Sequence, residues 1–167
     1  MSEPIIIGID HGYSNIKTSH TVFPAGVVEY ANEPYSMENV LEYQGKYFVI
    51  GSGRQFLQRD KPLTDHYYLM TLASIARELE VRHAPTESTV VLAAGLPLTE
   101  YGRDREKFTK YLMGDSTPVD FRYAGKAHHI TVTAVKLFPQ GYSAILTQPE
   151  LLEEPSVIVA DIGGCTV

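Results

Sequence analysis

Short apolar runs separated by glycine turns dominate the first third of the chain. Residues 5–10 (IIIGID) are rich in β-branched side chains, which predicts a strand buried on both faces. The His11-Gly12 turn and residues 14–23 predict an antiparallel partner, so that the two segments form a hairpin. The same pattern predicts further strands at residues 27–31, 40–43 and 47–50.

In the middle of the chain the apolar residues follow a helical period. Over residues 64–80 apolar side chains recur at three- and four-residue steps, which predicts an amphipathic helix. Residues 88–94 (STVVLAA) predict a buried strand. Residues 99–113 are rich in charge and predict a surface helix that stops at Gly114.

The last third returns to short segments. Residues 119–123 and 130–138 predict another hairpin, and Pro139 is expected to open a short helix that reaches Thr147. The acidic residues 148–155 read as a linker, and residues 157–160 predict a last apolar strand. Hairpins, helices and single strands in this order predict a mixed α/β domain in which helices cover a sheet.

Composition narrows the possible functions. The 167 residues carry a net charge of −6 and no dense run of Lys or Arg, which argues against direct binding of nucleic acid. The apolar runs are far too short to span a membrane. The single cysteine, Cys165, fits a reducing compartment, so we expect a cytoplasmic protein.

The segment DHGYSNIK (residues 10–17), here called the first turn, joins an acid, a glycine turn and a lysine directly after the first strand. We expect Gly12 to adopt a positive φ and let the backbone approach a ligand. Lys17 could then place its ammonium on a phosphate. Asp10 suits such a site if a hydrated Mg²⁺ lies between its carboxylate and the phosphate. The amides expected to cradle phosphate oxygens are those of Tyr13, Ser14 and Asn15.

The segment DIGGCT (residues 161–166), here called the second turn, repeats the layout near the end of the chain. Two such turns, each after an apolar strand, predict two halves that close on one nucleotide. An ordinary Asp-x-Gly hairpin would give the first turn without any ligand, because short glycine motifs have many false positives. His11 could touch phosphate, but we expect it to be a solvated turn residue.

In these two turns the chain resembles the superfamily of actins, chaperone ATPases and sugar kinases. DHGYSNIK is most similar to the first phosphate loop of the ParM/StbA plasmid-segregation actins, in which Asn and Lys follow the glycine, and DIGGCT is similar to the second loop. HYYLMTLASIAREL, VVLAAGLPLTEY and VKLFPQGYSAIL resemble further segments of the family in the expected order. The resemblance implies a ribonuclease H-like actin-type lobe, with a mixed sheet of hairpin and parallel strands and covering helices.

The resemblance also implies a division of the chain. Residues 1–147 would form the first lobe, residues 148–155 a linker, and residues 156–167 the opening strand and phosphate loop of a second lobe. We therefore expect a fragment that does not hydrolyse ATP by itself, because half of the phosphate cage would belong to the missing lobe.

The family's cofactors are ATP or GTP with Mg²⁺, and the resemblance carries their contacts onto this chain. Asp10 and Asp161 would hold Mg²⁺ through water and act with Gln140 in catalysis, Gln140 by orienting the attacking water. The alternative for Gln140 is a polar residue at a helix N-terminus beside Pro139. The nucleotide-binding residues implied are Gly12, Tyr13, Ser14, Asn15, Lys17, Gly163, Gly164 and Thr166.

Three functions stay open at this point. The first is a lobe of a filament-forming ATPase that self-associates and segregates plasmid DNA through a DNA-binding adaptor protein. The second is a lobe of a metabolite kinase or chaperone-type ATPase, since a fold alone does not choose a function. The third is a non-enzymatic capping or binding module.

Overall fold

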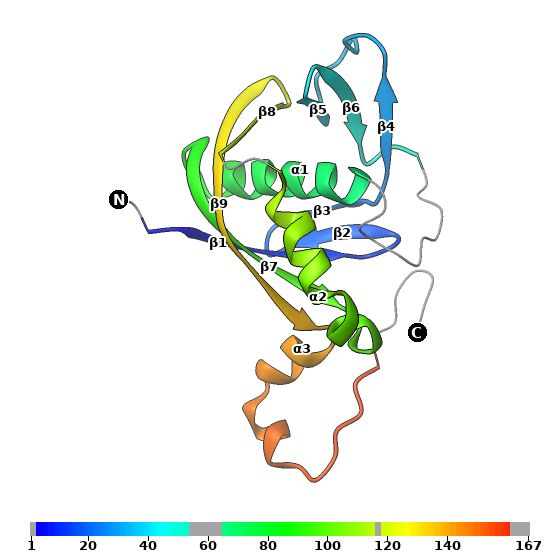
Figure 1. Cartoon of the computed structure of the whole chain (residues 1–167), viewed down its shortest axis with the longest axis vertical. Helices are drawn as coiled ribbons and strands as arrows, with labels where there is room; N and C mark the ends of the chain where they lie inside the picture. The colour runs from blue at the N-terminus through cyan, green and yellow to red at the C-terminus, as the bar shows by residue number, and fades with distance from the viewer. Residues whose placement is uncertain (1–2, 54–64, 116–117, 161–167) are drawn as a thin grey trace.

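Nine strands form one mixed sheet in the computed structural model, which describes residues 3–53, 65–115 and 118–160. The strands are β1 (Ile5–His11), β2 (Asn15–Thr18), β3 (Val22–Pro24), β4 (Val27–Tyr30), β5 (Val40–Tyr43), β6 (Lys46–Ile50), β7 (Glu87–Leu96), β8 (Val119–Tyr123) and β9 (Lys126–Pro139). The helices are α1 (Asp65–Val81), α2 (Leu98–Met113), α3 (Tyr142–Leu146) and the 3-10 helix η2 (Pro149–Glu153). The strand order is β3-β2-β1-β7-β9-β8-β5-β6-β4 (Figure 1).

The centre of the sheet is parallel and its flanks are antiparallel. β7 pairs in parallel with β1 on one side and with β9 on the other, whereas the outer strands form hairpins. The parallel strands therefore end at one edge, at His11, Leu96 and Pro139. This arrangement confirms the expected mixed sheet of hairpin and parallel strands.

The two outermost strands of the sheet are neighbours in the sequence. β3 ends at Pro24 and β4 begins at Val27, so only Ala25 and Gly26 connect them. Three Cα steps span at most about 11 Å, so both edges of the sheet must come together there. The sheet accordingly curls around α1 (Figure 1). We call the Ala25-Gly26 connection the seam.

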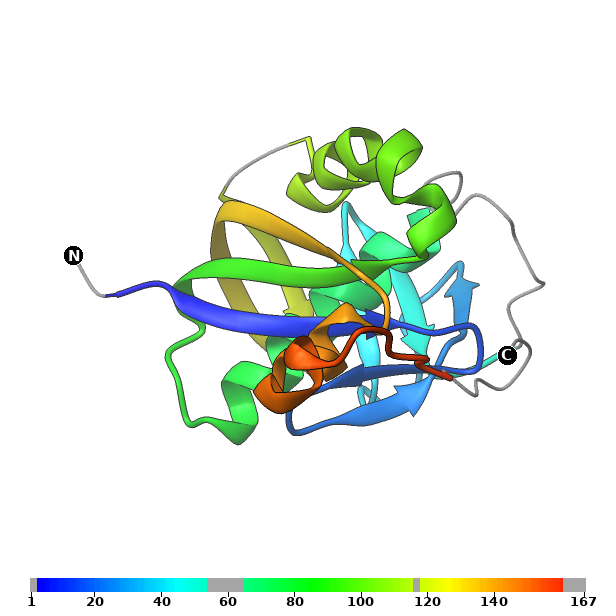
Figure 2. The ribbon, with the colours of Figure 1, turned by 90° about the horizontal axis from the view of Figure 1, so that it is seen from below.

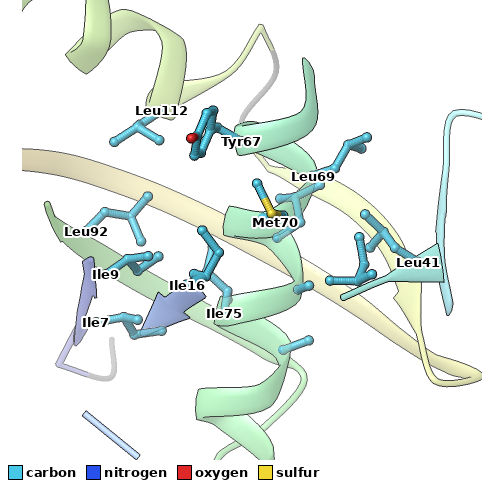
Figure 3. Packing of buried hydrophobic residues seen from close by; sticks show 14 of the residues in the cluster. Ile7, Ile9, Ile16, Leu41, Tyr67, Leu69, Met70, Ile75, Leu92 and Leu112 are labelled. Atoms are coloured by element: carbon cyan, nitrogen blue, oxygen red, sulfur yellow. The ribbon is translucent and has the colours of Figure 1, made fainter. Parts of the chain in front are cut away.

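Helix α1 lies inside this curl and is buried around most of its circumference. Eleven of its 17 residues are buried, which is typical of a core helix and not of a surface helix with one apolar stripe. Figure 3 shows its side chains packed among residues of β1, β2, β5, β7 and α2. Each fully buried leucine or isoleucine contributes about 1.5–3 kcal/mol, so this packing is the main source of stability. The labelled contacts include Ile7, Ile9, Ile16, Leu41, Leu92 and Leu112.

One carboxylate is buried in this interior. Glu78 of α1 is fully buried and accepts hydrogen bonds from Thr18 Oγ1 and from the backbone N–H of His20, at 2.5 and 2.9 Å. The guanidinium of Arg82 donates to Glu78 Oε2 and also reaches the carbonyl oxygen of Ile6 at 2.9 Å. Burial alone would raise the pKa of Glu78, but the hydrogen bonds from Thr18, His20 and Arg82 lower it to about 2. Glu78 thus ties the turn between β2 and β3 to α1.

The structure corrects three of the expected elements. The segment predicted as one strand over residues 14–23 is two strands, β2 and β3, because the chain reverses between Thr18 and Val22. Pro139 does not open a helix. It is the last residue of β9, held in register with Leu96, and α3 starts only after Gly141, whose φ is 81°.

The third correction concerns the predicted strand at residues 157–160. This segment has no regular secondary structure, and Val157, Ile158 and Val159 are 38%, 96% and 43% exposed. An apolar run can join a sheet only beside a strand that lacks a partner on one side. The parallel strands β1, β7 and β9 each have a partner on both sides. Within residues 148–155, for which a linker was predicted, Pro149–Glu153 form the 3-10 helix η2.

No helix in the described part of the chain is long and apolar enough to cross a bilayer.

Candidate functional site

A cleft of about 600 Å³ opens where the three parallel strands end. Along β1 the side chains of Ile7, Ile9 and His11 face α1, so the alternating residues Gly8 and Asp10 face the other way. The cleft lies on this second face, and α3 and the segment after it form its outer wall (Figure 2). The ends of parallel strands are a common place for ligands in α/β sheets. The residues of the cleft used below are Asp10, Gly95, Gln140 and Gly141.

The acid and the lysine of the first turn stand side by side. Asp10 and Lys17 are cross-strand partners in β1 and β2, and their side chains form an ion pair of 3.3 Å. Both side chains are about half exposed, at 48% and 54%. An exposed pair of this kind is worth about 1 kcal/mol at most, so Lys17 can turn to a stronger anion at little cost.

Gly12 is required by close packing and not by its backbone angle. Its φ is outside the left-handed region, contrary to the sequence-based expectation. A Cβ at this position would lie 2.6 Å from the carbonyl oxygen of Asn15, which belongs to the same turn. The carbonyl oxygen of Ser14 accepts a hydrogen bond from Ala25 N at 3.0 Å, so the turn is also attached to the seam.

Replacing Gly12 with alanine should open the first turn and lower the free energy of unfolding by about 1–3 kcal/mol, because the added methyl meets backbone. Urea unfolding measures the change. Gly8→Ala is the matched control, since a Cβ there meets nothing within 4 Å. Equal stability of the two variants would show that the turn gives way freely.

Gln140 reaches the same cleft from the end of β9. Its backbone N–H donates to the carbonyl oxygen of Leu96 at 2.7 Å, which extends the pairing of β7 and β9 by one residue. Its Cγ lies 3.0 Å from the place that a Cβ of Gly95 would occupy. The side chain of Gln140 therefore packs against β7 at a position that has no side chain of its own. The structure therefore brings together Asp10 and Gln140, two residues that are 130 positions apart in the sequence.

His11 is not the solvated turn residue that we expected. Its exposure is 0%, and its Nε2 lies 2.8 Å from Thr71 Oγ1 of α1. The rings of Tyr67 and Phe108 contact it edge-on, at centroid distances of 6.0 and 5.7 Å. The alternation Ile7, Ile9, His11 was the available signal, because it places His11 on the buried face of β1.

The model for the N-terminal domain of actin-like proteins matches residues 8–142. The chain belongs to this family. The actin-like chain has the fold of the apo psk41 ParM protein, with 21% identity and a TM-score of 0.66 over 83% of this chain and 50% of that one. It also matches AlfA from B. subtilis plasmid pLS32, solved as a filament, with 16% identity and a TM-score of 0.63 over 85% of this chain and 58% of that one.

A third structure with this fold is Ta0583, an archaeal actin homolog in complex with ADP, with 19% identity and a TM-score of 0.67 over 88% of this chain and 47% of that one. The actin-like chain thus spans about half the length of these proteins. A search of curated proteins finds no significant match. The family match confirms the expected first lobe of an actin-like protein.

Part of the expected site cannot be placed. Asp161, Gly163, Gly164 and Thr166 of the second turn lie outside the described residues. Within the described ranges, no cluster of three or more His, Cys, Asp or Glu side chains could hold a metal ion. The donor that is present, the half-exposed carboxylate of Asp10 at the cleft, fits Mg²⁺, which usually keeps several waters and takes few carboxylates.

Proposed function

We propose that this chain is the first lobe of an actin-like ATPase that binds Mg·ATP, or Mg·GTP, in the cleft at the ends of the parallel strands. The observation that carries the proposal is the meeting of the Asp10–Lys17 pair and Gln140 at one cleft. A relative of the same fold was solved with ADP, which supports a nucleotide as the ligand. Membership of the actin-like family favours this hypothesis over a kinase, a chaperone lobe or a capping module.

The proposed roles follow from the chemistry of the side chains. The ammonium of Lys17 would leave Asp10 and contact a phosphate, and the amides of Tyr13, Ser14 and Asn15 would bind its oxygens together with the backbone at Gly12. Asp10 would hold the waters of Mg²⁺, an ion that neutralises charge on the phosphates when bound. Gln140 would align the attacking water by hydrogen bonding, because an amide is too weak a base to take its proton.

The second half of the site would come from the second turn and a further lobe. In this proposal residues 1–147 form the first lobe, residues 148–155 link it, and residues 156–167 open the second lobe. Asp161 would share the waters of Mg²⁺, and Gly163, Gly164 and Thr166 would close on the phosphates from the other side. This chain alone would then bind nucleotide weakly and would not turn it over.

The biological role that we propose is the segregation of plasmid DNA in the cytoplasm by filaments. AlfA, a relative from a plasmid, was solved as a filament, which supports self-association of the complete protein. The net charge of −6 makes direct DNA binding unfavourable, so a DNA-binding adaptor would carry the cargo. Light scattering by the full-length protein with and without ATP tests the filament.

A titration of the chain with Mg·ADP, followed residue by residue by NMR, tests the nucleotide site. We expect millimolar binding, with shifts at residues 10–17, Gly95 and Gln140. Lys17→Met should weaken it about tenfold, because it removes a charge-assisted hydrogen bond. Lys46→Met is the matched control, since Lys46 forms a similar exposed ion pair with Glu29, at 2.9 Å, away from the cleft.

Equal losses in the two lysine variants would mean that only net charge matters and would contradict the assignment of Lys17. Asp10→Asn should remove the difference in affinity between ADP and Mg·ADP. Steady hydrolysis by this chain alone would contradict the division of the site between two lobes.

A further inference from the structure

We propose that His11 is a positioning residue that fixes the first turn to helix α1 through Thr71. The proposal rests on the proposed function for the ligand of the turn, but the geometry that carries it belongs to this chain alone. His11 is the last residue of β1 and lies between Asp10, which lines the cleft, and Gly12, where the backbone leaves the strand. A ring held in place therefore restrains the backbone on which both of them depend.

The hydrogen bonds around Thr71 define which atom of His11 carries a proton. Thr71 Oγ1 has one hydrogen, and it donates that hydrogen to the carbonyl oxygen of Tyr67 at 2.8 Å. At its 2.8 Å contact with His11 Nε2, the same oxygen must therefore accept. His11 is thus held as a donor from Nε2, and the bond points from the end of β1 to the first turns of α1.

The aromatic neighbours fix the plane of the ring. Tyr67 contacts it from α1 and Phe108 from α2, each with an edge-to-face geometry, and both side chains are buried. A ring so enclosed has one orientation, so the bond to Thr71 has one direction. The end of β1 is in this way attached to two helices at His11, directly before Gly12.

A fixed turn matters because its amides must be aimed before a phosphate arrives. A site that is ordered before binding loses less conformational entropy when the ligand binds, so its affinity is higher. Asp10 and Lys17 are exposed and supply no such rigidity themselves. The rigidity comes from the buried face of β1, which includes His11 and lies opposite the cleft.

The test separates order in the turn from stability of the fold. His11→Leu keeps an apolar side chain at the site but loses the bond, and Thr71 still donates to Tyr67, so the free energy of unfolding should fall by only about 1 kcal/mol. The amide order parameters of residues 12–15 in the ligand-free chain should fall from about 0.85 toward 0.6. Affinity for Mg·ADP should fall several-fold, because a turn that has lost order must be ordered again when the ligand binds.

Conservative variants give the rescue. His11→Gln should restore order in the turn, because its amide can donate to Thr71 Oγ1 from nearly the same place. Thr71→Val should act like His11→Leu, and Thr71→Ser like the native residue. Ser74→Ala is the matched control. Ser74 is buried on α1, and its hydroxyl donates to the carbonyl oxygen of Met70 at 2.8 Å, as that of Thr71 donates to Tyr67. The Thr71 hydroxyl also contacts His11, whereas the bond described for Ser74 stays within α1.

The outcomes are distinct. Unchanged order parameters in both His11→Leu and Thr71→Val would overturn the proposal. Loss of order in these two variants, with rescue in His11→Gln and Thr71→Ser, would support it. If the turn loses order as expected but the native chain binds no Mg·ADP, the proposed function fails and the positioning role stands. Should His11→Leu not fold, the comparison of Thr71→Val with Thr71→Ser decides the question.

Discussion

Glu78→Gln should lower the free energy of unfolding by about 3 kcal/mol at neutral pH. The native carboxylate has a pKa of about 2 in the folded state, against 4.5 for the free side chain. Its stabilisation is therefore fully present above about pH 5 and is lost as the pH falls toward 2. A glutamine amide would also present N–H groups to the guanidinium of Arg82, leaving buried donors without acceptors.

Urea unfolding at pH 7, 5 and 3 measures this effect. The native chain should lose stability between pH 5 and pH 3, and the Glu78→Gln chain should lose much less over the same range. Glu80→Gln is the matched control: Glu80 also lies on α1 and pairs with Lys126, but both side chains are more than half exposed. Its loss should be small, because solvent screens the pair. Equal pH profiles of native and Glu78→Gln chains would refute the role of the buried carboxylate.

Gly26→Ala should be the most damaging small substitution, with a loss of at least about 3 kcal/mol. An added Cβ would lie 2.1 Å from the carbonyl oxygen of Gly53 and 2.4 Å from that of Ser52. Both are backbone atoms, so no rotamer change can relieve the contact. The backbone N–H of Gly51 also donates to the carbonyl oxygen of Gly26 at 2.8 Å, and this bond would stretch or break.

The comparison variant is Gly102→Ala on α2, where a Cβ would meet nothing within 4 Å. Alanine in a helix is favoured over glycine by about 1 kcal/mol, so this variant should be slightly more stable than the native chain. Thermal unfolding of both variants gives the contrast. If the Gly26→Ala chain unfolds at the same temperature as the native chain, the backbone at the seam is not closely packed in solution and the prediction is wrong.

The sequence predicts most of the elements because their signals are local. Glycine turns between apolar runs located the hairpins. The three- and four-residue period located α1, and the charged run that stops at Gly114 located α2, each within one or two residues. The errors arise where tertiary pairing decides. Pro139 stays in β9 because β7 continues beside it. Residues 157–160 form no strand there because β1, β7 and β9 already have a partner strand on both sides.

The candidate site was predictable to the extent that it follows from motifs. Asp10, Lys17 and Gln140 were named from the first turn and the segment FPQGYSAIL, and the structure places all three at the end of the parallel strands. The residues behind them were not found. His11 was assigned to solvent although it continues the buried face of β1, and the burial of Glu78 depends on Thr18 and His20, about 60 residues away.

The seam has a further consequence for how copies of this chain can assemble. A free strand at the margin of a sheet can recruit a strand from another molecule, but here the two margins are three and four residues long and turn toward each other. Growth by strand addition is therefore disfavoured on both. If copies of this lobe polymerise, we expect them to meet through side-chain surfaces, whose contacts can be broken and remade while the sheet stays intact.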